Sequence, residues 1–302
     1  SVNSFTGMSA LQQAYEAASA NGGDIITLSS GEFTAVTTIE KSVRIVGAYG
    51  LDPNDSYGTF IAGAVTVNAD NVKLEGMYFK SNVTLAAVNN CTIKRCWINN
   101  LKQSGEHTNT LIDQCVVKYD YAIETGVNYG IKNSTLDYFA AMNTTANVAN
   151  ITNCLVWWFY SYDNNNDRQP YAVYKNNILI LENYSSTNRT LTLSSPSEFY
   201  NNYLYRTTIS SSNYSSYYVT CNFSTGCVNV GNVYSGETSK TNVTAVYPDT
   251  LSFTVEGVTV GITGGEGFNK YPGIPRVLTS TIDAQTDDKG KLNASITVQA
   301  EK

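Results

Sequence analysis

A six-residue pattern recurs through the middle of the chain and constrains its fold more than any other feature. The pattern has apolar residues at its first and last positions and a small or polar residue at its fourth. Successive fourth positions are separated by 19, 19, 19, 20, 22, 26 and 29 residues. A nearly constant period of this size predicts a solenoid, in which each repeat forms one coil and stacks on its neighbours. The eight copies begin at Leu74, Ile93, Ile112, Ile131, Ile151, Val173, Phe199 and Val228.

The residue types in these repeats favour strands over helices. The repeats are rich in Val, Ile, Thr and aromatic residues, and Asn, Asp and Gly separate them. They lack the longer apolar periodicity that a helical solenoid needs. About 20 residues suit one coil of three short strands, with coils stacked about 4.8 Å apart. Each position then lies above its equivalent, which predicts interior columns. One column starts with Leu74, Ile93 and Ile112, a second with Phe79, Ile98 and Val117, and the column between them contains Met77, Cys96, Cys115, Ser134, Cys154, Asn176 and Asn202.

In these columns the chain resembles the right-handed parallel β-helix proteins of the pectin-lyase-like superfamily. That family stacks Asn or small residues at the bend between its second and third strands, where Asn176 and Asn202 lie here. The amino end, residues 11–50, resembles the family's short capping helix and first strands. The resemblance covers about residues 9–235 and implies an all-β fold, a single-stranded right-handed parallel β-helix. Since the family includes lyases, hydrolases, esterases, tail-spike proteins and non-enzymatic adhesins, it predicts the fold more specifically than the activity.

The two ends of the chain depart from the repeat. Residues 9–22 are predicted to form a capping helix, with Ser9 and Gln12 as a capping box and Gly22-Gly23 as the stop. We therefore expect one β-helix domain over residues 1–238. Residues 239–302 contain alternating strand patterns separated by Gly, Pro and Asp turns, which predict an antiparallel β module that caps the helix or packs along its side.

An apolar column on the outside of the coils bears on where that module packs. If Cys96 and Ile98 point inward, their neighbours point outward, and the equivalent outward positions are often large and apolar. A patch of this size is unusual on a soluble monomer. We expect the tail or a loop to cover it, and a platform for a ligand or partner is the alternative. Its members are Trp97, Val116, Leu155, Trp157, Leu179, Tyr203 and Tyr205.

Composition limits the kinds of partner. The formal net charge is −6 and no basic run is present, which argues against a nucleic-acid partner. No apolar stretch reaches 18 residues, so no transmembrane segment is predicted. The chain begins at Ser1 rather than Met, from which we expect a removed signal peptide. The family resemblance implies a bacterial secreted or cell-surface protein.

The six cysteines have separate interpretations. Cys96, Cys115 and Cys154 are predicted to be buried free thiols, because stacked side chains that point the same way leave their Cβ atoms too far apart for a disulfide. Cys221 and Cys227 flank a short loop and are either bridged or free. A zinc site is disfavoured because paired C-x-x-C units are missing and His107 is the only histidine.

Longer loops interrupt the later coils, and they are the first candidates for binding. The loops at 160–171, 183–189 and 210–218 are rich in Tyr, Asn and Ser, a composition that suits sugars. Solvated turns are the alternative interpretation. Tyr160 and Tyr162 are the candidate aromatic binding residues.

A group of charged residues is the second candidate. Lys102, Glu106 and His107 fall in one coil, Glu124 in the next, and Asp163, Asp167 and Arg168 two coils later. Stacking brings Glu106, Glu124 and Asp163 within about 15 Å, taking three coil spacings. The predicted catalytic residues are Glu124, Arg168 and Lys102, and the predicted binding residues are Glu106, His107, Asp163, Asp167, Tyr160 and Tyr162. Oxygen ligands here also suit Ca²⁺, although no cofactor is required. Ordinary solvated charges are the alternative.

Two functions follow from these features. The first is polysaccharide binding without catalysis, because neither the paired carboxylates of glycoside hydrolases nor a nearby histidine motif is present. The second is a polysaccharide lyase or glycoside hydrolase that uses the 102–168 residues. A structural repeat in a larger surface assembly is a third hypothesis.

Overall fold

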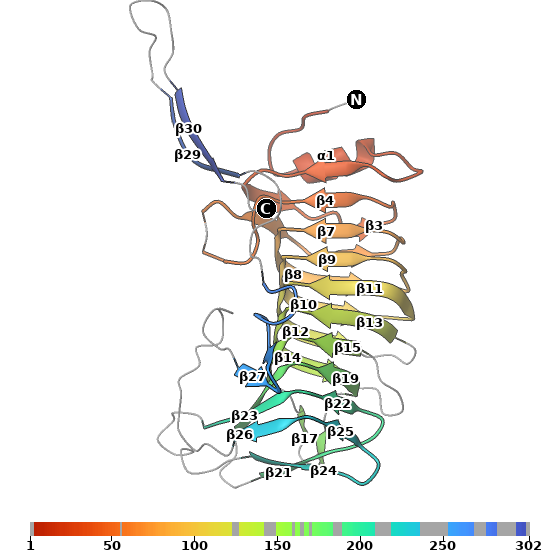
Figure 1. Ribbon diagram of the computed structural model, residues 1–302. Helices are drawn as coiled ribbons and strands as arrows, with labels where there is room; N and C mark the ends of the chain where they lie inside the picture. Colours follow the sequence, from red (N-terminus) through yellow and green to blue (C-terminus); the bar gives the residue numbers. More distant parts are fainter. Residues whose placement is uncertain are drawn as a thin grey trace, which may run out of the picture.

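The structure is a computed structural model that describes residues 3–54, 56–122, 127–141, 149–158, 161–163, 166–168, 171–183, 189–208, 219–235, 253–268, 276–282 and 294–299. Strands stack along one axis, with helix α1 (Ala10–Ala17) at the amino-terminal end (Figure 1). Two long parallel sheets form the walls of the stack. The predicted fold class, an all-β parallel β-helix with a capping helix and a small carboxy-terminal antiparallel sheet, is confirmed.

The first sheet has ten strands, and each strand pairs with its equivalents in the coils before and after. In spatial order they are β1 (Ile25–Thr27), β4 (Arg44–Val46), β7 (Lys73–Glu75), β9 (Thr92–Lys94), β11 (His107–Asp113), β13 (Val127–Lys132), β15 (Ala149–Thr152), β19 (Ala172–Lys175), β22 (Glu198–Tyr200) and β25 (Val228–Val230).

The second sheet has twelve strands. Its main path is β2 (Gly31–Thr34), β5 (Thr59–Ala62), β8 (Tyr78–Leu85), β10 (Trp97–Gln103), β12 (Val116–Ala122), β14 (Thr135–Ala141), β16 (Leu155–Trp158), β20 (Ile178–Asn183), β23 (Tyr203–Thr208) and β26 (Val233–Ser235), with β3 (Thr38–Ile39) and β6 (Val65–Val67) at the side.

Each regular coil has two strands instead of the three expected. In β10 the inward side chains are Ile98, Leu101 and Gln103. The residues that face the interior therefore change from even-numbered to odd-numbered after Ile98. The register with β8 also shifts at that point. The second and third expected strands therefore run together as one bent strand, because the bend interrupts the alternation without ending the backbone pairing.

Smaller sheets adjoin the two walls, and one of them contributes Leu191 and Leu193 to the core. The described strands form four two-stranded sheets, of which only β21–β24 is parallel. The pairs are β17 (Ser161–Asp163) with β18 (Asn166–Arg168), β21 (Arg189–Leu193) with β24 (Val219–Phe223), β27 (Phe253–Val255) with β28 (Val258–Val260), and β29 (Arg276–Ile282) with β30 (Ala294–Gln299).

The predicted interior columns are present in the regular coils. Leu74 pairs with Ile93, Ile93 with Ile112, and Ile112 with Ile131. Phe79, Ile98 and Val117 form the second column. These side chains are at most 2% exposed. The sequence period therefore placed like residues above one another correctly over residues 74–156.

The predicted register is correct at Phe199, Asn202 and Leu204 but wrong by one residue in the coils that begin at Val173 and Val228. Ile151 pairs with Tyr174 rather than Val173, and Asn177 rather than Asn176 occupies the buried column. The prediction of Leu179 as an outward residue fails for the same reason, because Leu179 lies in the core. A shift of one residue exchanges the two faces of a strand. In the last coil the column residue is Asn232, which follows the expected Gly231.

The buried asparagines connect consecutive coils through their side chains. Asn177 Oδ1 accepts the Cys154 N–H at 2.8 Å, and Asn202 Oδ1 accepts the Asn177 N–H at 3.0 Å. Asn232 Oδ1 accepts the Asn202 N–H at 2.8 Å. In the earlier coils, Cys115 Sγ and Ser134 Oγ accept the equivalent N–H groups. The column thus satisfies backbone N–H groups at the corner where the chain passes from the first sheet to the second.

The capping helix is shorter than predicted, and its capping box does not form. Ser9 is the N-cap residue but makes no side-chain cap hydrogen bond. Its Oγ instead accepts Gln13 Nε2 at 3.0 Å, and Gln12 Nε2 donates to Glu16. Leu11 and Tyr15 are buried on the end of the stack. The expected capping role is therefore carried by packing, while the chain leaves the helix at Ala18, before Gly22.

The later part of the apolar outer column is covered by residues 253–268, called the side segment below, while Trp97 packs with Tyr49 and Leu51. Val255, Val260 and Ile262 of this segment form one buried cluster with Leu155, Trp157 and Tyr205 of the column, and Ile178 belongs to the same cluster. Figure 1 shows β27 beside the stack rather than across its end. The division into domains 1–238 and 239–302 stays a prediction, while the packing of the side segment along the side of the coils is observed.

Candidate functional site

The predicted charged residues of the early coil lie in different environments. Lys102 is half-buried in β10, where its Cα partners are Thr84 and Tyr121. Glu106 is exposed in the turn between β10 and β11. His107, the first residue of β11, is only 1% exposed. Lys102 and Glu106 are thus available at the surface, whereas His107 points into the tube.

His107 belongs to a polar region of the interior. Its Nδ1 lies 3.3 Å from the Val88 carbonyl oxygen, which also accepts Thr110 Oγ1 at 3.3 Å. The Tyr129 ring contacts the imidazole edge to face. Burial lowers the pKa of His107 below its ordinary value of 6.5. A neutral imidazole inside the tube does not face a polysaccharide on the outside.

The later members of the predicted cluster fall on one hairpin. Tyr162 of β17 is the Cα partner of Asp167 in β18, and Ser161 is the partner of Arg168. Asp163 ends β17, opposite Asn166. Strand β18 packs against β21, in the later part of the stack. The hairpin therefore brings Tyr162, Asp163, Asp167 and Arg168 together, but its observed neighbour is not the coil of Lys102.

Two members of the predicted site, Glu124 and Tyr160, lie outside the described residues. Among the described residues, no group of three or more His, Cys, Asp and Glu side chains is arranged to hold a metal ion. The catalytic and calcium assignments consequently stay predictions of the sequence.

A different surface, called the amide groove below, has the geometry of a binding site. It is a hollow of about 530 Å³ on the outside of the first sheet, at the corner where the chain enters β4, β7, β9 and β11. Its lining crosses several coils, and eight of its eleven residues have polar side chains. The lining residues are Gly23, Asp24, Ile25, Ser42, Val43, Arg44, Asn71, Lys73, Asn90, Thr92 and Asn109.

Three of these residues are asparagines at the same place in successive coils. Asn71, Asn90 and Asn109 have φ angles of 62°, 56° and 53°. Asn is one of the few residues that tolerates this left-handed conformation. The backbone N–H of Asn71 donates to Asn89, and that of Asn90 donates to Thr108, which fixes the corner of each coil. Asn109 Nδ2 donates to Asn90 Oδ1 at 3.2 Å. The exposed amides therefore form an outer row with the period of the coils.

Charged side chains adjoin the row of amides. Lys73 is exposed, and Arg44 forms an ion pair with Glu75 at 3.0 Å. Arg95 approaches the other oxygen of Glu75 at 2.9 Å. In the lining itself Arg44 and Lys73 outnumber the one carboxylate, that of Asp24. The groove is therefore rich in hydrogen-bond donors and carries a small excess of positive charge.

An alternating charge column continues along the same sheet. Lys94 Nζ lies 3.0 Å from a carboxylate oxygen of the buried Asp113 side chain, and Lys132 Nζ lies 4.0 Å from the same atom. Lys132 also contacts Glu266 of the side segment at 2.8 Å. Opposite charges on neighbouring strands stabilise this face. These groups are engaged with one another, which favours a structural role for them and leaves the amide groove as the candidate surface.

The polar side chains of the amide groove suit recognition of a polar ligand. Asn, Ser and Thr side chains offer both donors and acceptors, and Arg44 and Lys73 offer charge-assisted donors. Hydrolysis of a glycosidic bond requires two carboxyl groups on opposite sides of the bond, whereas Asp24 is the single carboxylate in the lining.

The sequence interpretation missed this groove, although the sequence contains a signal for it. Asn71, Asn90 and Asn109 are separated by 19 residues, the same step as the buried columns. An exposed Asn that repeats with the coil period predicts a left-handed corner and an outer row of amides. Charged residues and long loops, the candidates that the sequence favours, do not indicate a corner of this kind.

All six cysteines are free thiols in the structure. Cys96, Cys115 and Cys154 are buried in one column, as predicted. Cys221 and Cys227, which the sequence analysis left as either bridged or free, are half-buried and form no disulfide. Helix α1 has eight residues, and no helix in the described part of the chain has the length and apolar character to cross a membrane.

Comparisons with protein-family models, curated proteins and solved structures give no match for this chain.

Proposed function

We propose that this chain is a secreted or cell-surface β-helix protein that binds a polysaccharide in the amide groove. The observation that carries the proposal is the row of Asn71, Asn90 and Asn109 in a hollow of about 530 Å³. A polysaccharide is itself a repeating ligand, and a row of identical amides offers it the same contacts at each coil.

The spacing and rigidity of the row support this proposal. Consecutive coils are about 4.8 Å apart, a distance comparable to the length of one sugar unit. The amides of Asn71 and Asn90 are attached to corners whose backbone N–H is bonded to the next coil. A ligand that binds such a row does not have to order a loop, so less conformational entropy opposes binding.

The charges of the groove favour a polysaccharide that is neutral or acidic. Lys73 and Arg44 lie beside the asparagines, and Asp24 lies at the amino-terminal end. An acidic sugar gains a charge-assisted hydrogen bond from Lys73. The same chemistry agrees with the pectin-lyase-like resemblance of residues 9–235, which we retain as part of the proposal.

The test is a glycan array followed by calorimetric titration of the best polysaccharide. Asn90→Gly removes the central amide without straining a left-handed corner, because Gly adopts positive φ readily. We expect about a tenfold loss of affinity from the loss of one or two hydrogen bonds. Asn201→Gly is the matched control, since Asn201 also has positive φ (52°) but lies in a later coil.

The outcomes separate the proposed function from its alternatives. A polysaccharide that binds both variants as tightly as the wild type contradicts the groove as the site. Shortened products on prolonged incubation, detected as new reducing ends or unsaturated termini, replace the binding function with the lyase or hydrolase alternative. An array without any hit contradicts polysaccharide binding itself.

A further inference from the structure

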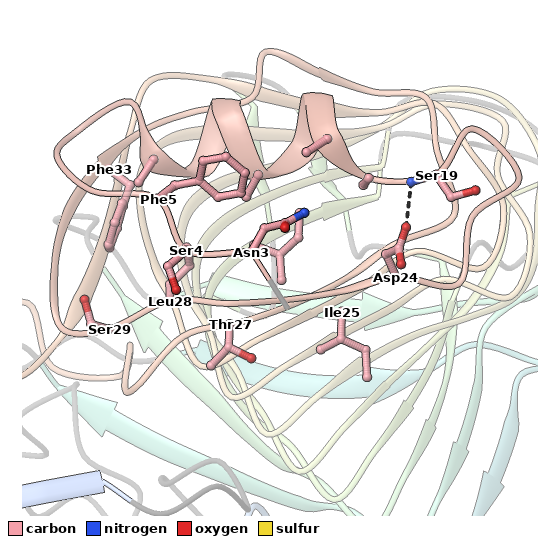
Figure 2. Close-up of a pocket in the computed structure, with 15 residues that line it drawn as sticks. Asn3, Ser4, Phe5, Ser19, Asp24, Ile25, Thr27, Leu28, Ser29 and Phe33 are labelled. Carbon is pink, nitrogen blue, oxygen red and sulfur yellow. Dashed lines mark hydrogen bonds between the residues drawn. The ribbon is translucent and has the colours of Figure 1, made fainter. Parts of the chain in front are cut away.

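The amino-terminal end of the stack has a second hollow, which shares Asp24 and Ile25 with the lining of the amide groove. It has a volume of about 570 Å³ and lies between α1, the segment 3–5 and the first strand of the first sheet. Figure 2 shows α1 on one side and the stretch from Asp24 to Ser29 on the other. The helix contributes only small side chains to the lining, those of Ala10, Ala14, Ala17 and Ala18.

The free edge of β1 faces this hollow. The backbone oxygen of Asp24 accepts the Arg44 N–H, and the Leu28 N–H donates to the backbone oxygen of Val46. In and beside β1, the even-numbered residues therefore direct their backbone groups toward β4. In a parallel strand the N–H and C=O groups of the alternate residues then point to the opposite side. Ile25 and Thr27 therefore present their backbone groups away from β4. In the described part of the chain these groups have no backbone partner.

The cap protects the two sheets unequally. At the edge of the second sheet, the Thr34 N–H of β2 donates to Met8 O at 2.8 Å, so the amino-terminal arm pairs with that edge. At the end of α1, Lys41 Nζ donates to the Tyr15 and Ala18 carbonyl oxygens. Ile25 of β1 is 63% exposed beside an open hollow. An unpaired edge next to an exposed apolar residue is a template for another strand.

The chain also carries two strands that lack further partners. Strands β29 and β30 form a two-stranded antiparallel sheet, and no third described strand pairs with either. A hairpin of two strands is marginally stable in water. Figure 1 shows this hairpin reaching beyond the stack at the end where α1 lies. The hairpin and the open edge of β1 are thus at the same end of the molecule.

We propose that a second copy of this chain places its β29–β30 hairpin in the hollow and adds it to the edge of β1. The reciprocal contact follows from two-fold symmetry, since each copy offers one hairpin and one open edge. Pairing satisfies the outward backbone groups of Ile25 and Thr27, and it gives the hairpin a third strand. The result is a dimer joined at the amino-terminal ends of the two stacks.

Sedimentation velocity over a wide range of concentrations tests the dimer in the full chain. Ile25→Pro deletes an N–H that faces the hollow and is not used in pairing with β4, and Pro is tolerated at such edge positions. Ile25→Thr is the matched control, because it retains the N–H and is a good strand former. We expect dimerisation to weaken at least tenfold in Ile25→Pro and to persist in Ile25→Thr.

A second variant and a second measurement keep the test decisive. Ile25→Lys leaves the strand intact at an exposed position and brings two like charges to the interface, so it is also expected to be monomeric. Hydrogen exchange should show that the amides of β29–β30 are protected in the dimer and exchange faster in the monomeric variants. A wild-type chain that is monomeric throughout overturns the proposal, as does a dimer that Ile25→Pro and Ile25→Lys leave intact. Loss of the dimer without any change in β29–β30 exchange overturns the hairpin as the occupant.

Discussion

Asn177 Nδ2 donates to Asn202 Oδ1 at 3.0 Å and to the Ile151 carbonyl oxygen at 2.8 Å, so one amide joins three consecutive coils. Its own Oδ1 accepts the Cys154 N–H. The side chain is fully buried. The adjacent Asn176 has positive φ (56°) and lies at the corner. Two asparagines next to each other in the sequence therefore have different structural roles.

This difference predicts unequal costs for the two substitutions. Asn177→Ala leaves buried backbone groups of Ile151 and Cys154 without their partners, and we expect a loss of about 3 kcal/mol in the free energy of unfolding. Asn176→Gly keeps the left-handed corner and should change that free energy by less than about 1 kcal/mol. Urea denaturation followed by circular dichroism measures both. Equal costs for the two variants would contradict the register of the later coils.

The side segment is predicted to depend more on Asn133 than on the neighbouring ion pair. Asn133 is buried, and its Nδ2 donates to Gly264 O at 2.7 Å and to Ile262 O at 3.1 Å. Asn133→Gly is compatible with the positive φ at this position and should cost about 2 kcal/mol. Lys132→Met removes the contact with Glu266, whose side chain is mostly exposed, and should cost less than about 1 kcal/mol.

Hydrogen exchange of residues 253–262 separates these two contributions. Faster exchange in Asn133→Gly, with little change in Lys132→Met, is the expected result. The reverse order would show that the salt bridge, rather than the buried amide, holds the side segment against the coils.

The buried histidine predicts a pH dependence of stability. Burial lowers the pKa of His107 in the folded chain, whereas the unfolded chain has the ordinary value of 6.5. Below that value the unfolded state binds a proton that the folded state does not bind. The free energy of unfolding should therefore fall as the pH decreases from 6.5 to the folded pKa, by at most about 1.4 kcal/mol per pH unit.

His107→Leu provides the control for this prediction, because His107 is the only histidine. The carboxylates titrate in both proteins. The urea midpoint should therefore fall further in the wild type than in His107→Leu between about pH 7.5 and about pH 5.5, and the excess reports His107. A variant whose stability changes with pH as much as that of the wild type would show that His107 is not the group responsible.

The thiol column predicts very unequal reactivity of the cysteines. Burial raises the pKa of Cys96 and of Cys154 to about 12, and it raises the pKa of Cys115 well above its ordinary value. Only thiolates react rapidly with a disulfide reagent. In the native protein near neutral pH we expect slow reaction at these three residues and faster reaction at the half-buried Cys227.

Unfolding the protein in denaturant completes this experiment. All six thiols should then react, since the structure has no disulfide. A count of four would instead indicate a bridge between Cys221 and Cys227. Rapid native labelling of Cys96 or Cys154, located by mass spectrometry, would contradict their position inside the tube.

The sequence determined the parts of this protein that follow from its period. Repeats with a step of 19 or 20 residues placed Leu74, Ile93 and Ile112 in one column, because equal coils stack like residues on one another. The period also predicted that Cys96 and Cys115 share a column. It failed at Asn176, where two adjacent asparagines fit the pattern and only the alternation of the strand decides which of them faces inward.

Only the tertiary structure decided what happens where the chain departs from the period. It placed the side segment against the outer apolar column, because burial of Ile178 and Tyr205 requires a partner that no local pattern identifies. It also gathered Asn71, Asn90 and Asn109 into one groove and left Ile25 and Thr27 at an open edge. Such surfaces arise from residues that are distant in the chain and adjacent in the stack, so their shape depends on how coils, cap and tail meet in space.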